Sequence, residues 1–330
     1  VAKEYQEQKK NPHILGLTAS PGSDKKTIKE ICKNLGIEKI EVRTRDSEDV
    51  KEYLQELKFE IIKLDFPPYL EKIREPIKKI YNQKIEELRK RKLLFLPATK
   101  KNLLELQHRI MRAISTGNKN FNLFAGASAC AQTIKLQHLL ELLETQTVYS
   151  ANLYMQDLIL QGESKKSKAA SQLIKKAEFQ FADSSLKKLI RDSIEHPKLA
   201  KLKEIVEKEF KENKKTKIIV FSQYRDTVTR ICKELNSIPG IKARVFVGQA
   251  KKRGGEETGL SQKEQQELIY QFSIGEINIL CATSIGEEGL DIPEVNAVIF
   301  YEPVPSAIRK IQRAGRTARL MKGKLIILLT

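Results

Sequence analysis

Five short apolar runs, separated by segments of helical pattern, constrain the fold of this sequence more than any other feature. Continuous apolar runs of this kind are typical of strands buried on both faces, as in parallel sheets covered by helices. The runs occupy residues 217–221, 242–247, 277–282, 297–301 and 324–329, and the helical patterns occupy residues 198–210, 226–236, 262–273 and 307–321. We therefore predict a parallel α/β sheet domain over residues 196–330. Ligands of such sheets bind beyond the carboxyl ends of the strands.

The middle of the sequence, residues 65–195, has a purely helical pattern. Apolar residues recur there at helical spacing. Three such series are Ile73, Ile77, Ile80, Ile85 and Leu88; Leu103, Leu106, Ile110 and Ile114; and Leu136, Leu139, Leu140 and Leu143. The run of small residues at 125–131 predicts a close crossing of two helices. We expect an all-α insert here, called the helical insert below.

The first 64 residues predict the tail of another α/β domain. Helical patterns alternate there with apolar runs that suit buried strands. The helices are expected at 25–35 and 47–57, and the strands at 14–17, 40–43 and 59–64. The sequence thus divides into residues 1–64, 65–195 and 196–330.

The charge of the chain predicts a polyanionic partner. The net charge is +18, and it is uneven. Residues 1–64 contain 13 basic and 12 acidic residues, residues 65–195 contain 23 basic and 14 acidic residues, and residues 196–330 contain 24 basic and 16 acidic residues. A phosphate backbone is the commonest target of such an excess, so nucleic acid is the expected partner of the second and third segments. The alternative is a solvated surface rich in Lys and Glu, as in heat-adapted proteins.

Two basic clusters interrupt the helical insert, at residues 89–92 and 165–168. Lys and Arg in such clusters bind phosphates, and these contacts carry no sequence information. The alternative for each cluster is a solvated face or a mobile loop. Aromatic residues are few in this segment, so base stacking is not expected to be the main mode of binding.

Several kinds of site and segment are not expected. Four scattered cysteines and four isolated histidines show no metal-ligand spacing, so no metal site is predicted. The sequence contains neither the phosphate-binding pattern G-x-x-x-x-G-K-[ST] nor an Asp-Glu dipeptide. No apolar run is long enough to span a bilayer, and no signal peptide opens the chain, so no membrane partner is expected.

The stretch from residue 283 to residue 319 has the chemistry of a polyphosphate site. It begins with a glycine-rich loop that carries carboxylates after an apolar run, and it ends with Arg316 and Arg319, three residues apart on one face of the predicted helix. Arginine stays charged and bonds phosphate oxygens bidentately. The alternative is that the two arginines only bond a neighbouring loop or a helix end.

These blocks resemble motifs V and VI of superfamily 2 helicases. Residues 218–225, 246–250 and 300–309 sharpen the resemblance to the archaeal Hef helicase-nuclease and its eukaryotic relative FANCM. The chain departs from the usual pattern at Ala314, where relatives tend to have a basic residue, and at Ala318, where most have glycine. The resemblance implies a RecA-like second motor domain at 196–330, a helical insert that grips DNA, and a remnant of the first RecA-like domain at 1–64.

The resemblance also implies roles for single residues. Arg316, Arg319 and Gln312 would complete the catalytic site for ATP held by the other motor domain, and Gly289, Asp291 and Glu287 would approach the nucleotide, with Asp291 bonding the ribose. Nucleic-acid contacts are implied at Thr283, Ser284, Gly248, Gln249, Ser222, Arg225, Lys251 and Lys252. Thr18 and Ser20 would couple hydrolysis to nucleic-acid binding, although they also suit ordinary turn and helix-cap chemistry.

The expected function is therefore part of an ATP-dependent helicase or translocase of forked, branched or duplex DNA, acting in fork repair with ATP and Mg²⁺. The missing pattern G-x-x-x-x-G-K-[ST] is the P-loop of such helicases, and the missing Asp-Glu dipeptide belongs to their acidic box. This polypeptide alone is therefore not expected to hydrolyse ATP. The alternatives are a non-catalytic nucleic-acid-binding module and an RNA-sensing or RNA-remodelling motor. A nuclease domain is a possible further partner after Thr330, and the expected location is the archaeal cytoplasm and nucleoid, or the nucleus in a eukaryote.

Overall fold

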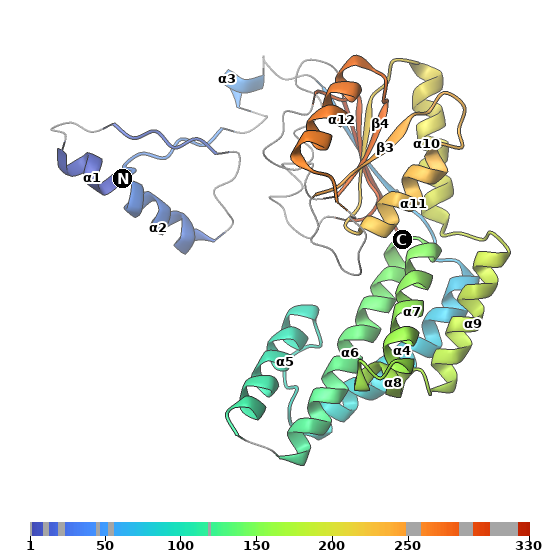
Figure 1. The fold of residues 1–330 in the computed structure, drawn as a ribbon. Coiled ribbons are helices and arrows are strands. Elements are labelled where there is room, and N and C mark those ends of the chain that lie inside the picture. Colours follow the sequence, from blue (N-terminus) through green and yellow to red (C-terminus); the bar gives the residue numbers. More distant parts are fainter. Residues whose placement is uncertain are drawn as a thin grey trace. The chain divides into compact units, whose positions relative to one another are not determined.

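The computed structural model describes residues 2–8, 13–18, 24–43, 47–51, 56–117, 120–248, 259–283, 293–303 and 323–330. The chain divides into two compact units, one that contains the sheet and one that is helical (Figure 1). The helices are α1 (Ala2–Gln8), α2 (Lys25–Leu35), α3 (Glu48–Lys51), α4 (Pro68–Lys90), α5 (Lys100–Ser115), α6 (Phe121–Thr145), α7 (Val148–Glu163), α8 (Lys168–Leu173), α9 (Ala177–Arg191), α10 (Pro197–Glu212), α11 (Arg225–Leu235) and α12 (Gln262–Ile274). The strands are β1 (Leu57–Lys63), β2 (Ile218–Phe221), β3 (Ala243–Phe246), β4 (Ile279–Ala282), β5 (Ala297–Phe300) and β6 (Gly323–Leu329).

The strands form one six-stranded sheet in the order β1-β6-β5-β2-β4-β3. β2 pairs in parallel with β4 and β5, β3 pairs in parallel with β4, and β5 with β6. Every residue of β2, β4 and β5 is buried, as expected for continuous apolar runs between covered faces. The predicted parallel α/β domain is therefore confirmed. The register aligns Phe221 with both Ala282 and Phe300, so these strands end at the same edge.

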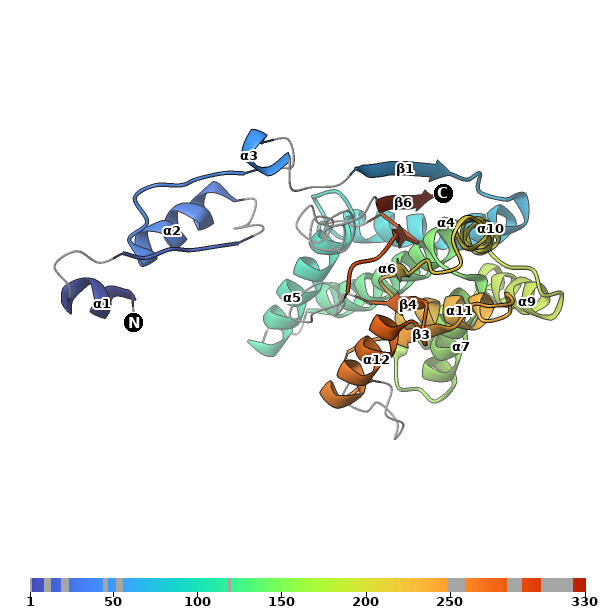
Figure 2. The same ribbon diagram turned by 90° about the horizontal axis from the view of Figure 1, so that it is seen from above.

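β1 lies beside β6, at the edge of this sheet (Figure 2). Gly323 N donates to Glu56 O at 3.0 Å and Leu64 N donates to Leu329 O at 2.9 Å, so the two strands run in the same direction. The strand itself is where the sequence predicts it, but we expected it to belong to the first RecA-like domain. Local pattern identifies a strand but not its neighbour, because strand pairing depends on tertiary packing. The domain limits at residues 64 and 195 stay predictions.

Residues 14–17 and 40–43, which were expected to be strands, have no regular secondary structure. Leu15 and Leu17 are 82% and 86% exposed. The prediction is wrong here because an apolar run becomes a strand only when a neighbouring strand bonds its backbone groups. The helix between these runs forms as predicted. Asp24 caps α2 by accepting hydrogen bonds from two backbone N–H groups, and Gly36 ends it with a φ of 65°.

The helical unit comprises residues 62–209, 224–238 and 328–330. α4, α6, α7 and α9 enclose one apolar core, and α4, α5 and α6 enclose a second. The residues predicted from helical spacing are buried in these cores, except Ile114, which packs against the second. Cys130 Sγ lies 3.4 Å from Leu103 O, so α5 and α6 cross closely at the run of small residues. The all-α insert is thus confirmed.

Helix α11 follows β2 in the sequence but packs within the helical unit. The buried hydroxyls of Ser150 on α7 and Thr227 on α11 are 3.0 Å apart. Arg230 on α11 forms an ion pair with Glu195 at 3.4 Å, and its guanidinium lies 5.5 Å from the centre of the Tyr149 ring. The hydroxyl and ring contacts join α11 to α7, and the ion pair joins α11 to the segment between α9 and α10. Across the part of the chain that the structure describes, every helix is too short or too polar to cross a membrane.

Candidate functional site

The carboxyl edge of the sheet brings three predicted nucleic-acid contacts together. Ser222 follows β2, Gly248 comes shortly after β3, and Thr283 follows β4. Ser222 N donates to Ala282 O at 3.0 Å, and Thr283 N donates to Phe246 O at 3.2 Å. The three residues therefore lie where a parallel sheet binds its ligand.

Glu302 supports this edge from the end of β5. Its side chain is buried, and its carboxylate accepts hydrogen bonds from Ser222 Oγ at 3.0 Å and from Gln223 N. A buried carboxylate needs such donors, and charge makes these bonds stronger than neutral ones. Our sequence reasoning gave Glu302 no role. The signal was present, because an acidic residue directly after an apolar strand faces the ligand edge of the sheet.

The contact with Glu302 changes the interpretation of Ser222. The side chain of Ser222 is fully buried, and its hydroxyl donates to the carboxylate. Ser222 therefore helps to hold the loop after β2 in place, and its nucleic-acid contact stays a prediction. Thr283 is also buried, with 7% of its surface exposed.

Tyr224 comes two residues after Ser222, directly before α11, and belongs to the helical unit. Its hydroxyl donates to Glu141 Oε1 on α6 at 2.8 Å, and Lys100 Nζ donates to Glu141 Oε2 at 3.1 Å. Burial raises the pKa of Glu141, but hydrogen bonds from His138, Tyr224 and Lys100 outweigh burial and lower the pKa to about 2. Glu141 is therefore a charged anchor for the start of α11.

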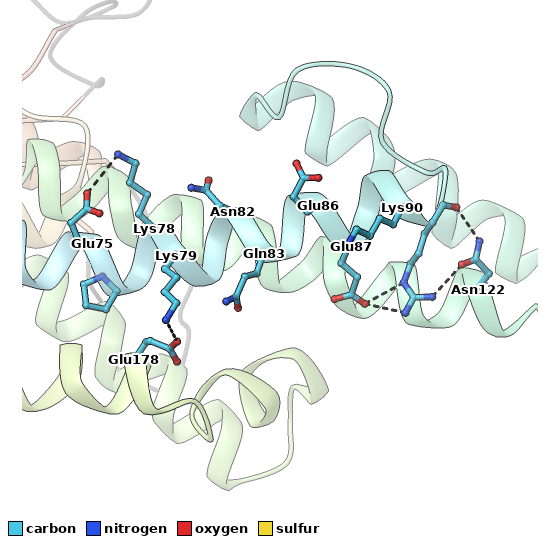
Figure 3. A pocket seen from close by; sticks show the side chains of 12 residues that line it. Glu75, Lys78, Lys79, Asn82, Gln83, Glu86, Glu87, Lys90, Asn122 and Glu178 are labelled. Atoms are coloured by element: carbon cyan, nitrogen blue, oxygen red, sulfur yellow. Dashed lines mark hydrogen bonds and ion pairs between the residues drawn. The ribbon is translucent and has the colours of Figure 1, made fainter.

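A groove of about 1400 Å³ runs along α4 in the helical unit (Figure 3). Its lining includes four basic and four acidic side chains. Several of them pair: Lys79 lies 3.2 Å from Glu178, and Arg91 lies 3.0 Å from Glu87. Because the charges balance, the groove does not suit a polyanion.

The two basic clusters of the helical insert differ in their partners. In the first, Arg89 pairs with Glu86 at 2.8 Å and Arg91 pairs with Glu87, so acidic residues of α4 compensate two of its four charges. In the second, at 165–168, all three lysines are exposed. Among the ion pairs between described residues, none involves them, and residues 164–177 contain five lysines and no acidic residue. The second cluster therefore suits phosphates better than the first.

The remaining predicted site residues have less structural support. Arg225 is half-buried at the start of α11, and Thr18 is exposed. Outside the described residues lie Arg316, Arg319, Gln312, Gly289, Asp291, Glu287, Ser284, Gln249, Lys251, Lys252 and Ser20. Their roles stay predictions.

Comparison with known proteins assigns the chain to a family. Residues 197–321 match the family described as helicase conserved C-terminal domain, and residues 69–196 match the one described as putative ATP-dependent RNA helicase, helical bundle. The crystal structure of the Pyrococcus furiosus Hef helicase domain is 40% identical to the chain with a TM-score of 0.75, over 100% of this chain and 67% of that one. The chain belongs to the Hef and FANCM family of superfamily 2 helicases. The two matched regions of this Hef-type chain correspond to the helical insert and the RecA-like sheet domain.

Curated relatives cover nearly the whole Hef-type chain. A protein of Methanocaldococcus jannaschii named putative ATP-dependent RNA helicase is 40% identical over 100% of this chain and 40% of its own length. The ATP-dependent DNA helicase mph1 of Neurospora crassa is 32% identical over 97% of this chain and 28% of its own length. The putative ATP-dependent DNA helicase fml2 of Schizosaccharomyces pombe is 31% identical over 96% of this chain and 42% of its own length. The chain therefore spans less than half the length of these relatives.

Proposed function

We propose that this chain is part of an ATP-dependent DNA helicase or translocase that acts on forked or branched DNA in replication-fork repair. The similarity to the Hef helicase domain over the whole chain is the observation that carries this proposal. The relatives named ATP-dependent DNA helicases support it. In this proposal, residues 196–330 are the second motor domain, β1 adds a strand to its sheet, and the rest of residues 1–64 is a remnant of the first.

ATP with Mg²⁺, bound between two motor domains, supplies the free energy for movement along DNA. Arg316 and Arg319 compensate the charge that develops on the transferred phosphoryl group, and Gln312 lies beside the phosphates. Asp291 bonds the ribose, and Gly289 and Glu287 lie close to the nucleotide. The ligands of Mg²⁺ belong to the acidic box, which this sequence does not contain.

Nucleic acid is bound at the carboxyl edge of the sheet and by the helical insert. Thr283, Ser284, Gly248 and Gln249 contact the sugar-phosphate backbone, together with Arg225, Lys251 and Lys252. Glu302 positions this edge by holding Ser222 and Gln223 N. In the helical insert, the exposed lysines of the second basic cluster bind phosphates.

The test measures ATP turnover by a longer polypeptide that joins this chain to its upstream motor half. Arg316→Ala should lower DNA-stimulated turnover by about a thousandfold, as expected for an arginine that stabilises the transition state, and leave DNA affinity unchanged. The matched control is Arg191→Ala, which changes an exposed arginine on α9 and should leave turnover unchanged. Turnover by Arg316→Ala equal to that of the control would exclude the proposed role. This chain alone should show no ATP hydrolysis.

An RNA-directed motor is the second candidate, because the helical-bundle family and the Methanocaldococcus jannaschii relative carry that name. Only RNA offers 2′-hydroxyl groups, so stimulation of turnover by RNA but not by DNA would select this candidate. If the longer polypeptide binds nucleic acid without hydrolysing ATP, it is a non-catalytic binding module.

A further inference from the structure

Two phenylalanines stand exposed at the start of α6. Phe121 is 81% exposed and Phe124 is 48% exposed. Phenylalanine is among the residues most often buried, and neighbouring exposed rings mark surfaces that bind a partner. Residues 121, 124 and 128 follow the spacing of one helix face, so both rings lie on the face that also carries Ser128. The two rings are called the phenylalanine pair below.

This face of α6 leads directly to α8, which lies beside it (Figure 1). Ser128 Oγ donates to Gln172 Oε1 on α8 at 2.8 Å, and Gln132 Nε2 donates to the same oxygen at 2.6 Å. Phe124 is one helical turn from Ser128, about 6 Å along the axis, and Phe121 is about 10 Å from it. The phenylalanine pair is therefore next to the segment that contains α8.

Lysines flank α8 on both sides. Lys165, Lys166 and Lys168 form the second basic cluster at its start, and Lys175 and Lys176 follow its end. All but Lys176 are exposed, and acidic residues are absent from 164–177. Glu163 and Glu178 lie directly outside this segment, so the surface combines apolar rings with an excess of positive charge.

Single-stranded nucleic acid matches both parts of this surface. Its unpaired bases offer flat faces for stacking on aromatic rings, and its phosphates bind lysine. In a duplex, neighbouring base pairs cover those faces, so the rings add little to duplex binding. An acidic peptide would satisfy the lysines but offers no series of planar groups to the rings.

We propose that the phenylalanine pair stacks on unpaired bases of a single-stranded nucleic acid whose phosphates are bound by the lysines around α8. The proposal rests on the proposed nucleic-acid function and adds a site for the unpaired strand. It also revises the expectation from composition. Aromatic residues are few in the helical insert, but two of them are exposed beside the segment in which lysines are in excess.

The first experiment compares binding of single-stranded and duplex DNA of the same sequence by fluorescence anisotropy. Phe121→Ala with Phe124→Ala should weaken single-strand binding by about tenfold for each ring removed, and leave duplex affinity unchanged. The salt dependence should also stay the same, because no charge is removed. The matched control is Phe181→Ala, which removes a ring that is 52% exposed on α9 and should change neither affinity. Replacing Lys165, Lys166 and Lys168 by Ala should weaken both affinities and flatten the salt dependence.

The second experiment uses the absence of tryptophan from the sequence. Phe121→Trp places a single indole at the proposed site, and a stacked base should quench its fluorescence when single-stranded DNA binds. Phe181→Trp is the control and should show no quenching. Both changes are at exposed positions, so folding is not expected to limit the comparison.

The outcomes separate this proposal from the proposed function. If the double alanine variant binds single strands like the wild type and Phe121→Trp is not quenched, while the lysine variant still loses affinity, the stacking proposal is wrong and nucleic-acid binding stands. If the wild type binds neither form of DNA nor RNA, the proposed function itself fails. A change of oligomeric state in the double variant, without a change in single-strand affinity, would show that the rings contact a second copy of the chain and would also overturn the proposal.

Discussion

Glu141 should govern the acid stability of the chain. Its carboxylate accepts hydrogen bonds from Tyr224 and Lys100, and its pKa in the folded protein is lowered from 4.5 to about 2. Because the folded pKa is depressed, the stabilisation is present above pH 4.5 and is lost as the pH falls towards 2. The shift corresponds to about 3 kcal/mol, at about 1.4 kcal/mol for each pH unit. Of this, about 2 kcal/mol should disappear between about pH 6 and about pH 3.

The assay is urea unfolding of the wild type and of Glu141→Gln across this pH range. The amide keeps the shape of the side chain and an acceptor for Tyr224, but it removes the charge. The variant should be less stable by about 3 kcal/mol at about pH 6 and by only about 1 kcal/mol at about pH 3. Glu144→Gln is the matched control on the same helix. Burial raises the pKa of Glu144, so this carboxylate does not stabilise the fold more at about pH 6 than at about pH 3. Glu144→Gln should therefore lose at least as much stability in acid as the wild type.

This reasoning would be refuted if the free energy of unfolding changed with pH in the same way for the wild type and for Glu141→Gln. They would show that the carboxylate is bound no more tightly in the folded protein than in the unfolded chain. The comparison does not depend on other acidic groups, because these are common to both proteins and contribute equally to both curves.

Two further predictions concern backbone conformation and close packing. At Gly162 an added Cβ would lie 2.7 Å from a side chain and 3.2 Å from backbone atoms of α8, so Gly162→Ala should lose about 1–2 kcal/mol of stability despite its higher helix propensity. At Gly126 the added Cβ first meets the end of the Leu93 side chain, which can rotate away, so Gly126→Ala should leave the stability almost unchanged. Equal thermal stability of Gly162→Ala and Gly126→Ala would contradict the packing argument. Lys92 has a φ of 56° at the end of α4, so Lys92→Gly should gain up to about 1 kcal/mol, whereas Lys78→Gly inside α4 should lose about 1 kcal/mol. Chemical unfolding measures both, and a loss in both variants would exclude strain at Lys92.

Local pattern in the sequence was sufficient to predict most of the elements. The apolar runs at 218–221, 279–282 and 297–300 became buried strands because such runs have both faces to cover. The helical pattern predicted from residue 262 begins at Gln262 in the structure, where a capping box of Ser261 and Glu264 marks the start of α12. Pairing between distant segments could not be predicted in this way, so the neighbour of β1 was missed.

The charge of the helical insert was only partly predictable. Both basic clusters looked alike as runs of Lys and Arg. The acidic partners Glu86 and Glu87 lie three and four residues before Arg89 and Arg91, a spacing that pairs side chains on a helix. This signal was present in the sequence and distinguishes the two clusters. The exposure of the phenylalanine pair depends on how α6 packs against its neighbours, so composition alone could not reveal it.

The position of β1 affects where the chain can be shortened. A polypeptide that begins at residue 65, as the sequence division suggests, would keep β6 but lose the strand beside it. The backbone groups on that side of Gly323–Leu329, an almost wholly apolar segment, would then be open to pairing with another molecule. A polypeptide that begins before Leu57 keeps this edge covered and should resist aggregation better.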